Sequence, residues 1–250
     1  MTPAADPTAH FVDKWHRREP EMALAEVFCP PDARPVFRAW GALLHELREA
    51  TFELSDARVT VAKTQWWAEE LLLVSRGAGR HPVCAALPAD LPWAALARAV
   101  VEQASLDQRP ADAAQALAQV APLAEAIAAV EAGVHGHAPP VAAVSVNLLL
   151  HRLPHGLAAD DQARLPLNLL ARHGVTVAQV AAGQGEPLLR DWAGELLAAL
   201  PWPAAPSSLY RRLRHGFDRA RLRRLAAGRG FDPPPAPASL WRAWRLARAG

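Results

Sequence analysis

Three glutamates in one segment of the chain could bind a metal ion. Glu49 and Glu53 are four residues apart, and Glu46 lies three residues before Glu49. Residues at positions i and i+4 share one face of a helix, so these carboxylates would point the same way on a helical segment. Carboxylate oxygens are ligands that Mg²⁺ prefers. We favour the competing interpretation, a solvated helix face beside Arg48, because charged faces are the default on surface helices.

His151 and His155 form a second candidate site. A His-x-x-x-His pair on a helix can bind Zn²⁺ or another transition metal. Pro154 lies between the two histidines, and a proline there would interrupt the helical turn. Neutral imidazoles also suit Mg²⁺ poorly, because that ion prefers hard oxygen ligands. We therefore expect a loop with polar histidines at this point.

The sequence contains no motif for phosphate binding or nucleophilic catalysis. There is no glycine-rich phosphate loop, no G-x-S-x-G segment and no Cys–His pair in a supporting context. The two cysteines, Cys29 and Cys84, form no CxxC, which favours a reducing cytoplasm. The net charge is only +2, from 27 basic and 25 acidic residues, so we expect no nucleic-acid surface.

Helices must position these residues. Hydrophobic residues make up 51% of the chain and are mostly Ala and Leu, which are strong helix formers, whereas Tyr occurs once. We predict an all-α protein with a flexible lead-in at 1–19 and one domain over 20–250. The main helices are predicted at 33–54, 59–75, 91–106, 110–133, 141–153, 187–200, 207–227 and 240–248. Asp56 is the expected N-cap of the second of these helices, Gly133 the expected C-cap of the fourth, and a turn is expected at His173-Gly174.

Two C-terminal segments combine arginines with apolar residues. The final predicted helix, 240–248, carries Trp241 and Trp244 among arginines. Such segments suit an anionic membrane surface, but they also suit amphipathic helices that dock on the bundle. No apolar run approaches the ~20 residues that a membrane span needs. We expect a soluble, cytoplasmic protein, with peripheral membrane association as an alternative. The first segment, 211–229, holds eight arginines: Arg211, Arg212, Arg214, Arg219, Arg221, Arg223, Arg224 and Arg229.

Three segments, taken in order, resemble the squalene/phytoene synthase family. The tryptophan pair Trp66-Trp67 in an acidic helix is followed, after a glycine turn, by His81-Pro82. Asn147 then stands in Val-Asn-Leu-Leu, and Arg164-Leu-Pro-Leu leads to a His-Gly-Val run that ends at residue 175. The resemblance covers about residues 20–230. Residues 165–175 are similar to a family branch that includes a mitochondrial complex I assembly factor.

The resemblance implies an isoprenoid-synthase-like antiparallel helical bundle around a central cavity. In active members, two DxxxD motifs face each other across the cavity and hold Mg²⁺ ions on the diphosphates of two prenyl substrates, which are joined head to head. The resemblance would place the first motif on the 33–54 helix, which has no aspartate. It would place the second after Asn147, where His151 and His155 stand instead.

The missing aspartates predict a family member without standard Mg²⁺-dependent activity, which acts by binding a prenyl lipid or a protein partner. The alternative is an active prenyltransferase that uses Mg²⁺ with unusual ligands such as Glu49, Glu53 and His151. An open apolar cavity would favour a ligand or chemistry, and a filled one an assembly role. Trp66 is a candidate for lining such a cavity, although tryptophan pairs more often pack at the core. The candidate cavity residues are Glu46, Glu49, Glu53, Trp66, Asn147, His151, His155 and Arg164.

Overall fold

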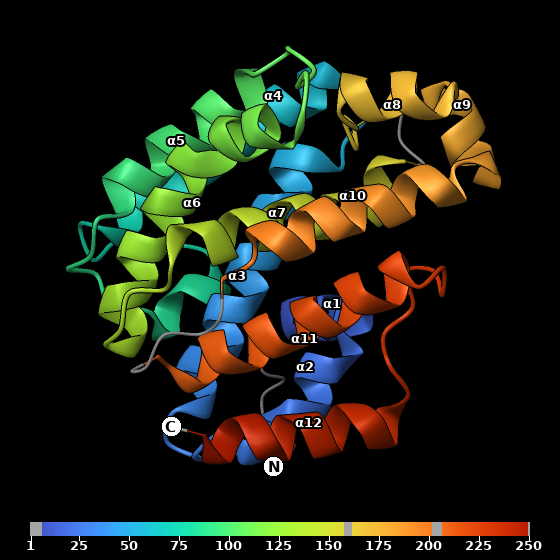
Figure 1. Ribbon diagram of the computed structural model, residues 1–250. Coiled ribbons are helices and arrows are strands. Elements are labelled where there is room, and N and C mark those ends of the chain that lie inside the picture. The colour runs from blue at the N-terminus through green and yellow to red at the C-terminus, as the bar shows by residue number, and fades with distance from the viewer. Residues whose placement is uncertain (1–6, 158–161, 202–206, 250) are drawn as a thin grey trace.

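The computed structural model describes residues 7–157, 162–201 and 207–249, and these residues form an all-α protein without a strand (Figure 1). The all-α prediction is therefore confirmed. The α-helices are α1 (Ala9–Arg18), α2 (Pro20–Ala25), α3 (Arg34–Phe52), α4 (Ala57–Val74), α5 (Trp93–Ser105), α6 (Ala113–His135), α7 (Val141–Gly156), α8 (Leu167–His173), α9 (Val177–Gln179), α10 (Glu186–Ala199), α11 (Leu209–Ala226) and α12 (Ala236–Arg248). Short 3-10 turns lie at Glu26–Phe28 and Pro82–Ala86, and a π turn lies at Val180–Gln184.

The predicted flexible lead-in is wrong from Ala9 onward. Residues Ala9–Arg18 form α1, and Trp15 on that helix is fully buried against Phe37 of α3. Gly41 of α3 permits this approach, because a Cβ at position 41 would overlap the Trp15 ring. A buried tryptophan removes much apolar surface from water, so the first helix is part of the folded core.

Several helix ends follow local chemistry. The Asp56 side chain accepts a hydrogen bond from the Arg58 backbone N–H at 2.8 Å, as an N-cap should. Gly174 ends α8 with a φ of 60°, so the predicted turn is confirmed. The prediction for Gly133 is wrong, because α6 continues to His135 and Gly136 takes the left-handed cap with a φ of 78°. At Gly133 a Cβ would overlap Leu91, so this glycine permits close packing.

Helix α7 also runs further than predicted. It continues through Pro154 to Gly156, which places His151 and His155 on one helix and not in a loop. Pro154 lies in the last turn of the helix, where only the i−4 hydrogen bond to Leu150 is lost. The two imidazoles are therefore held by helical geometry near the centre of the molecule.

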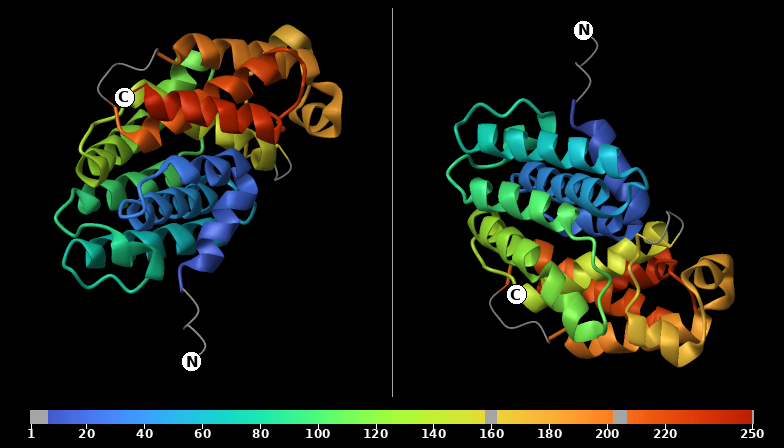
Figure 2. Two further views of the ribbon diagram at one scale, coloured as in Figure 1. Left: turned by 90° about the horizontal axis from the view of Figure 1, so that it is seen from below. Right: turned by 90° about the horizontal axis from the view of Figure 1, so that it is seen from above.

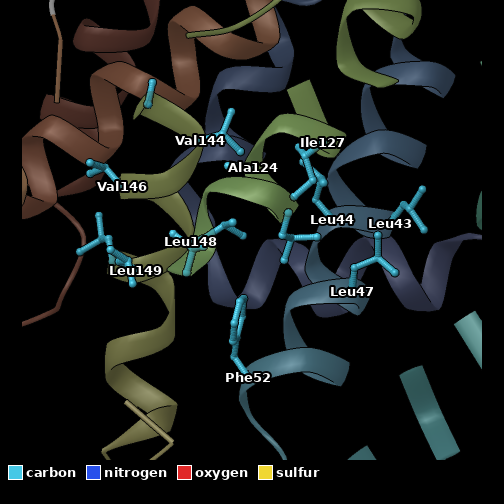
Figure 3. Packing of buried hydrophobic residues seen from close by; sticks show 14 of the residues in the cluster. Leu43, Leu44, Leu47, Phe52, Ala124, Ile127, Val144, Val146, Leu148 and Leu149 are labelled. Atoms are coloured by element: carbon cyan, nitrogen blue, oxygen red, sulfur yellow. The ribbon is translucent and has the colours of Figure 1, made fainter. Parts of the chain in front are cut away.

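The core lies where α3, α6 and α7 meet. Figure 2 shows the N-terminal helices on one side of the molecule and the C-terminal helices on the other, with neighbours in sequence packed as antiparallel pairs. Leu44 and Leu47 of α3 lie against Ile127 of α6 and Leu148 of α7 (Figure 3). These side chains are almost completely buried and fill the space between the three helices.

Helix α6 is the one described helix that is long and apolar enough to cross a membrane, by length and composition alone. In the fold α6 packs between α5 and α7, and its fully buried Glu131 forms ion pairs with Arg211 of α11. Ala-rich core helices of soluble proteins pass the same test.

Candidate functional site

The carboxylates of Glu46 and Glu49 lie between two lysines from other helices. Lys14 of α1 donates to Glu46 Oε1 at 2.8 Å and also contacts Glu49 Oε2, while Lys63 of α4 donates to Glu49 Oε1 at 2.6 Å. We call these four residues the lysine–glutamate cluster. The two glutamates are largely buried, so the expected solvated helix face is wrong. These are the only two lysines in the chain.

The choice of lysine at both positions has a physical reason. An ammonium group is a compact point charge with three rotatable donors, whereas a guanidinium is a broad planar fork. A compact group with three donors suits a position between carboxylates that share one turn of a helix. The remaining basic residues are all arginines, so the two exceptions meet at one place. The cluster closes α1 and α4 onto α3.

The group His45, Glu46 and Glu49 is the candidate metal site among the described residues, because their ligand atoms all lie within 4.8 Å of one another. We tested whether Mg²⁺ fits these residues. Burial raises the pKa of Glu49, but hydrogen bonds and charge from Lys14 and Lys63 outweigh it and lower the pKa to about 2. Both carboxylates thus already have counter-ions, and a divalent cation would meet two ammonium groups. The cluster does not fit Mg²⁺.

His45 was not among the predicted site residues. Its side chain is buried, and burial, followed by the charges of Arg48 and Lys14, lowers its pKa to about 2. Nε2 makes no hydrogen bond and lies 3.9 Å from Glu49 Oε2. The imidazole is therefore neutral at physiological pH. The spacing His45-Glu46-x-x-Glu49 was the available sequence signal, since these positions lie on adjacent turns of one helix.

Glu53 points to a different partner from Glu49. It accepts a hydrogen bond from Arg18 of α1 at 3.1 Å, and this ion pair borders a pocket of about 230 Å³. His151 and His155 of α7 line the same pocket, with Arg48 among the residues beside them. We call this the polar pocket. The pocket thus brings Glu53 and His151 together, with His155 beside them, whereas Glu49, the third ligand named in the alternative enzyme hypothesis, does not line it.

A buried ion network adjoins the polar pocket, and Glu19, Arg48 and Arg221 of this network also line the pocket. Glu19, between α1 and α2, accepts hydrogen bonds from Arg48 of α3 and Arg214 of α11. Glu21 of α2 accepts from Arg221 at 2.8 Å and from Arg214 at 3.3 Å. Asp218 pairs with Arg214 and completes the network. The network thus has three carboxylates and three guanidinium groups and is formally neutral. Each charge is paired, as burial requires.

Asp218 connects this network to the residues singled out after Asn147. Its Oδ1 lies 3.0 Å from His151 Nε2 and 3.0 Å from Arg214, and its Oδ2 accepts from Asn147 Nδ2 at 2.7 Å. Burial raises the pKa of Asp218, but the charge of Arg214 and hydrogen bonds from His151 and Asn147 hold it far below the usual range. Burial also lowers the pKa of His151, so a neutral imidazole donates to a carboxylate.

The other predicted residues lie away from the pocket. Trp66 is on the outer face of α4 and is 41% exposed, whereas Trp67 is buried, so the core-and-edge interpretation of the pair is confirmed. Arg164 has a φ of 44° and donates to the backbone carbonyl of Leu106. Its surroundings are α5 and the segment before α8, so it takes no part in the site.

Sequence reasoning missed most of the ion network. Arg211, Arg214 and Arg221 of the arginine-rich segment are buried, which neither the membrane-surface nor the amphipathic-helix interpretation of this segment predicted. Arg214 and Asp218 are spaced i, i+4, which was the local signal. Glu19 and Glu21 were hidden in and just after the predicted lead-in. No family model matches this chain, and no curated protein matches it.

Proposed function

We propose that this chain is a binding protein in an isoprenoid-synthase-like bundle, related to the squalene/phytoene synthases, that does not perform Mg²⁺-dependent prenyl transfer. The lysine–glutamate cluster carries the proposal. A prenyl transferase of this type needs free carboxylates that hold Mg²⁺ on the departing diphosphate. Here Lys14 and Lys63 supply the positive charge that the metal would supply, and they are covalently part of the chain.

The lining of the interior supports the same conclusion. The polar pocket, at about 230 Å³, is smaller than the roughly 300–1,000 Å³ of sites for drug-sized ligands. It is lined by charged and histidine side chains, which suit a prenyl tail poorly because burying an apolar chain there would strip water from polar groups. The space between α3 and α7 is filled by leucines. A filled interior favours an assembly or partner-binding role over a prenyl-lipid carrier.

A second candidate function rests on a separate observation. The carboxylate of Glu53 and the imidazoles of His151 and His155 line one pocket. Arg48 lines the same pocket and would supply a cation facing a diphosphate. This arrangement favours the alternative of an active prenyltransferase with unusual ligands. Its weakness is that Glu53 is already paired with Arg18.

One experiment separates the two functions. Purified protein is incubated with farnesyl or geranylgeranyl diphosphate and Mg²⁺ or Mn²⁺, and diphosphate release and hydrocarbon products are measured. We expect no release above the protein-free blank from protein that circular dichroism shows to be folded. Turnover that is lost in Glu53→Gln, but kept in the surface control Glu69→Gln, would overturn the proposal and establish the enzyme.

A further inference from the structure

The C-terminal helix α12 presents an apolar, aromatic face to solvent. Its inner side packs on α2 and α11 through Ser239 and Ala243, which are buried. On the outer side Leu240 is 42% exposed, Trp241 58% and Trp244 41%. Tryptophan is rarely left this exposed without a partner surface, because each ring carries a large apolar area. Figure 1 shows α12 at the edge of the molecule, with no element outside it.

Arginines are arranged around these rings. The guanidinium of Arg245 lies 4.8 Å from the centre of the Trp241 ring, and that of Arg248 lies 4.6 Å from the centre of the Trp244 ring. Such cation–π contacts align the charged groups along the rings, so less side-chain freedom is lost when they bind. The outer face of α12 thus alternates aromatic surface with fixed positive charge.

A pocket of about 300 Å³ lies between α11 and α12 beside this face. Its lining includes Arg219 and Arg223 of α11 with Arg242 and Arg245 of α12, and no carboxylate is among the residues that line it. The contrast with the interior is clear, since Arg214 and Arg221 are each paired with buried acids. Among the described residues, Arg223, Arg242 and Arg245 thus bring three like charges to a pocket that no carboxylate lines.

One arginine in this pocket points to an external ligand. Arg242 has a buried NH1 atom with no hydrogen-bond partner, although a buried guanidinium nitrogen normally has one. Burial lowers the pKa of Arg242, and the like charges of Arg223 and Arg245 lower it further. An oxyanion in the pocket would accept that unused hydrogen bond and reduce the repulsion among the three arginines.

We propose that the outer face of α12 docks on an anionic phospholipid bilayer, with Trp241 and Trp244 at the headgroup boundary and the arginine pocket on lipid phosphates. The helix has 13 residues, too short to span the roughly 20-residue width of a bilayer, so it lies in the plane of the surface. Tryptophan is enriched at the headgroup boundary of bilayers, and each nearby arginine adds attraction to anionic headgroups. Exposed rings beside clustered arginines fit a lipid surface better than a soluble phosphate, which would use the arginines alone. This inference does not depend on the proposed function.

The test is flotation of the full chain with vesicles of phosphatidylcholine alone, or of phosphatidylcholine with an equal part of phosphatidylglycerol. We expect binding to the anionic vesicles only, and weaker binding as salt rises. The charge variant is Arg223→Gln with Arg245→Gln, both exposed. Its matched control is Arg76→Gln with Arg98→Gln, which removes the same charge at two exposed residues, one just after α4 and one on α5. Both helices lie far from α12 in Figure 1. We expect roughly tenfold or more loss of vesicle affinity for the first pair, and little loss for the control.

A second variant tests the aromatic part. Trp241→Ala with Trp244→Ala leaves net charge unchanged and should also release the protein from anionic vesicles. The double tryptophan variant must keep the thermal midpoint of the wild type, since both rings are on the outer face. Three outcomes would each overturn the proposal. They are an equal loss of vesicle affinity in the two double arginine variants, binding of the wild type to vesicles of phosphatidylcholine alone, and no flotation of folded wild type. Displacement by millimolar inorganic phosphate would overturn it in favour of a free-anion site.

Discussion

Two lysines determine the chemistry of the carboxylate cluster on α3. Glu46 and Glu49 have the side chains of a Mg²⁺ site, but Lys14 and Lys63 approach them from α1 and α4. Burial lowers the pKa of Lys14, yet hydrogen bonds and charge from the two glutamates outweigh it and raise the pKa. Lys14 therefore stays charged across the physiological range, and the cluster, with two carboxylates and two ammonium groups, is formally neutral without a metal.

Replacing both lysines should create a cation site. Lys14→Met with Lys63→Met keeps side-chain volume and leaves two neighbouring carboxylates without counter-ions, which should cost about 1–3 kcal/mol of unfolding free energy. Mg²⁺ or Mn²⁺ should restore part of that loss, while the wild type should not respond to either ion. Urea denaturation with and without the metal measures this.

The control for that comparison is Arg172→Met with Arg190→Met, which removes two exposed ion-paired cations on α8 and α10. It should lose less than about 1 kcal/mol and gain nothing from metal. If Mg²⁺ stabilised the wild type as strongly as the lysine variant, the lysines would not be what prevents metal binding.

At the scale of elements, Asp218 joins α7 to α11. It accepts hydrogen bonds from Asn147 and His151 of α7 and pairs with Arg214 on its own helix. Arg214 also forms ion pairs with Glu19 and Glu21 near the N-terminus. Segments that are far apart in sequence are thus held together by charges that are almost fully buried.

Asp218→Asn should destabilise the protein strongly. The substitution keeps the shape but removes the negative charge, so Arg214 loses one of its buried counter-ions, and we expect a loss of about 3–5 kcal/mol. Asp191→Asn is the matched control, because Asp191 also bonds a histidine, His173 at 2.9 Å, but its side chain is 44% exposed. The control should cost about 1 kcal/mol or less. Similar losses for both variants in chemical denaturation would contradict the role of burial.

At the scale of the whole molecule, burial keeps most histidines neutral. Burial is the largest cause that lowers the pKa in each case, and for His45 and His215 the pKa falls to about 2 and about 4. In the unfolded chain these imidazoles regain a pKa of about 6.5 and bind protons that the folded protein excludes. The histidines with a lowered pKa are His16, His45, His81, His135, His151, His155 and His215.

Stability should therefore fall with acid. Because the folded pKa values lie below the unfolded value, stability from these histidines is complete above about pH 6.5 and is lost as the pH falls below it. The depressed pKa of Glu49 acts in the same direction, but only below about pH 4.5. His45→Gln should reduce the loss between about pH 7.5 and pH 5 by roughly 2 kcal/mol, measured by urea denaturation. An unchanged slope in His45→Gln would refute the assignment.

Local features of the sequence determined the helical class and many helix ends. Ala and Leu content, the Asp56 cap and the Gly174 turn act within a few residues, so they can be predicted without knowing what packs against them. The division of Trp67 to the core and Trp66 to its edge follows from helical periodicity in the same way. Pro154 shows the limit, since a proline in the last turn of a packed helix costs less than its position suggested.

Only the tertiary structure decided which charges are buried and what they pair with. Glu21 and Arg221 are 200 residues apart, and Lys14 and Lys63 meet Glu49 from separate helices. No local pattern records such pairs, because a buried charge is stable only when the folded chain brings its counter-ion to it. The same glutamates that suggested a metal site on the isolated helix are therefore ion-pair partners in the folded protein.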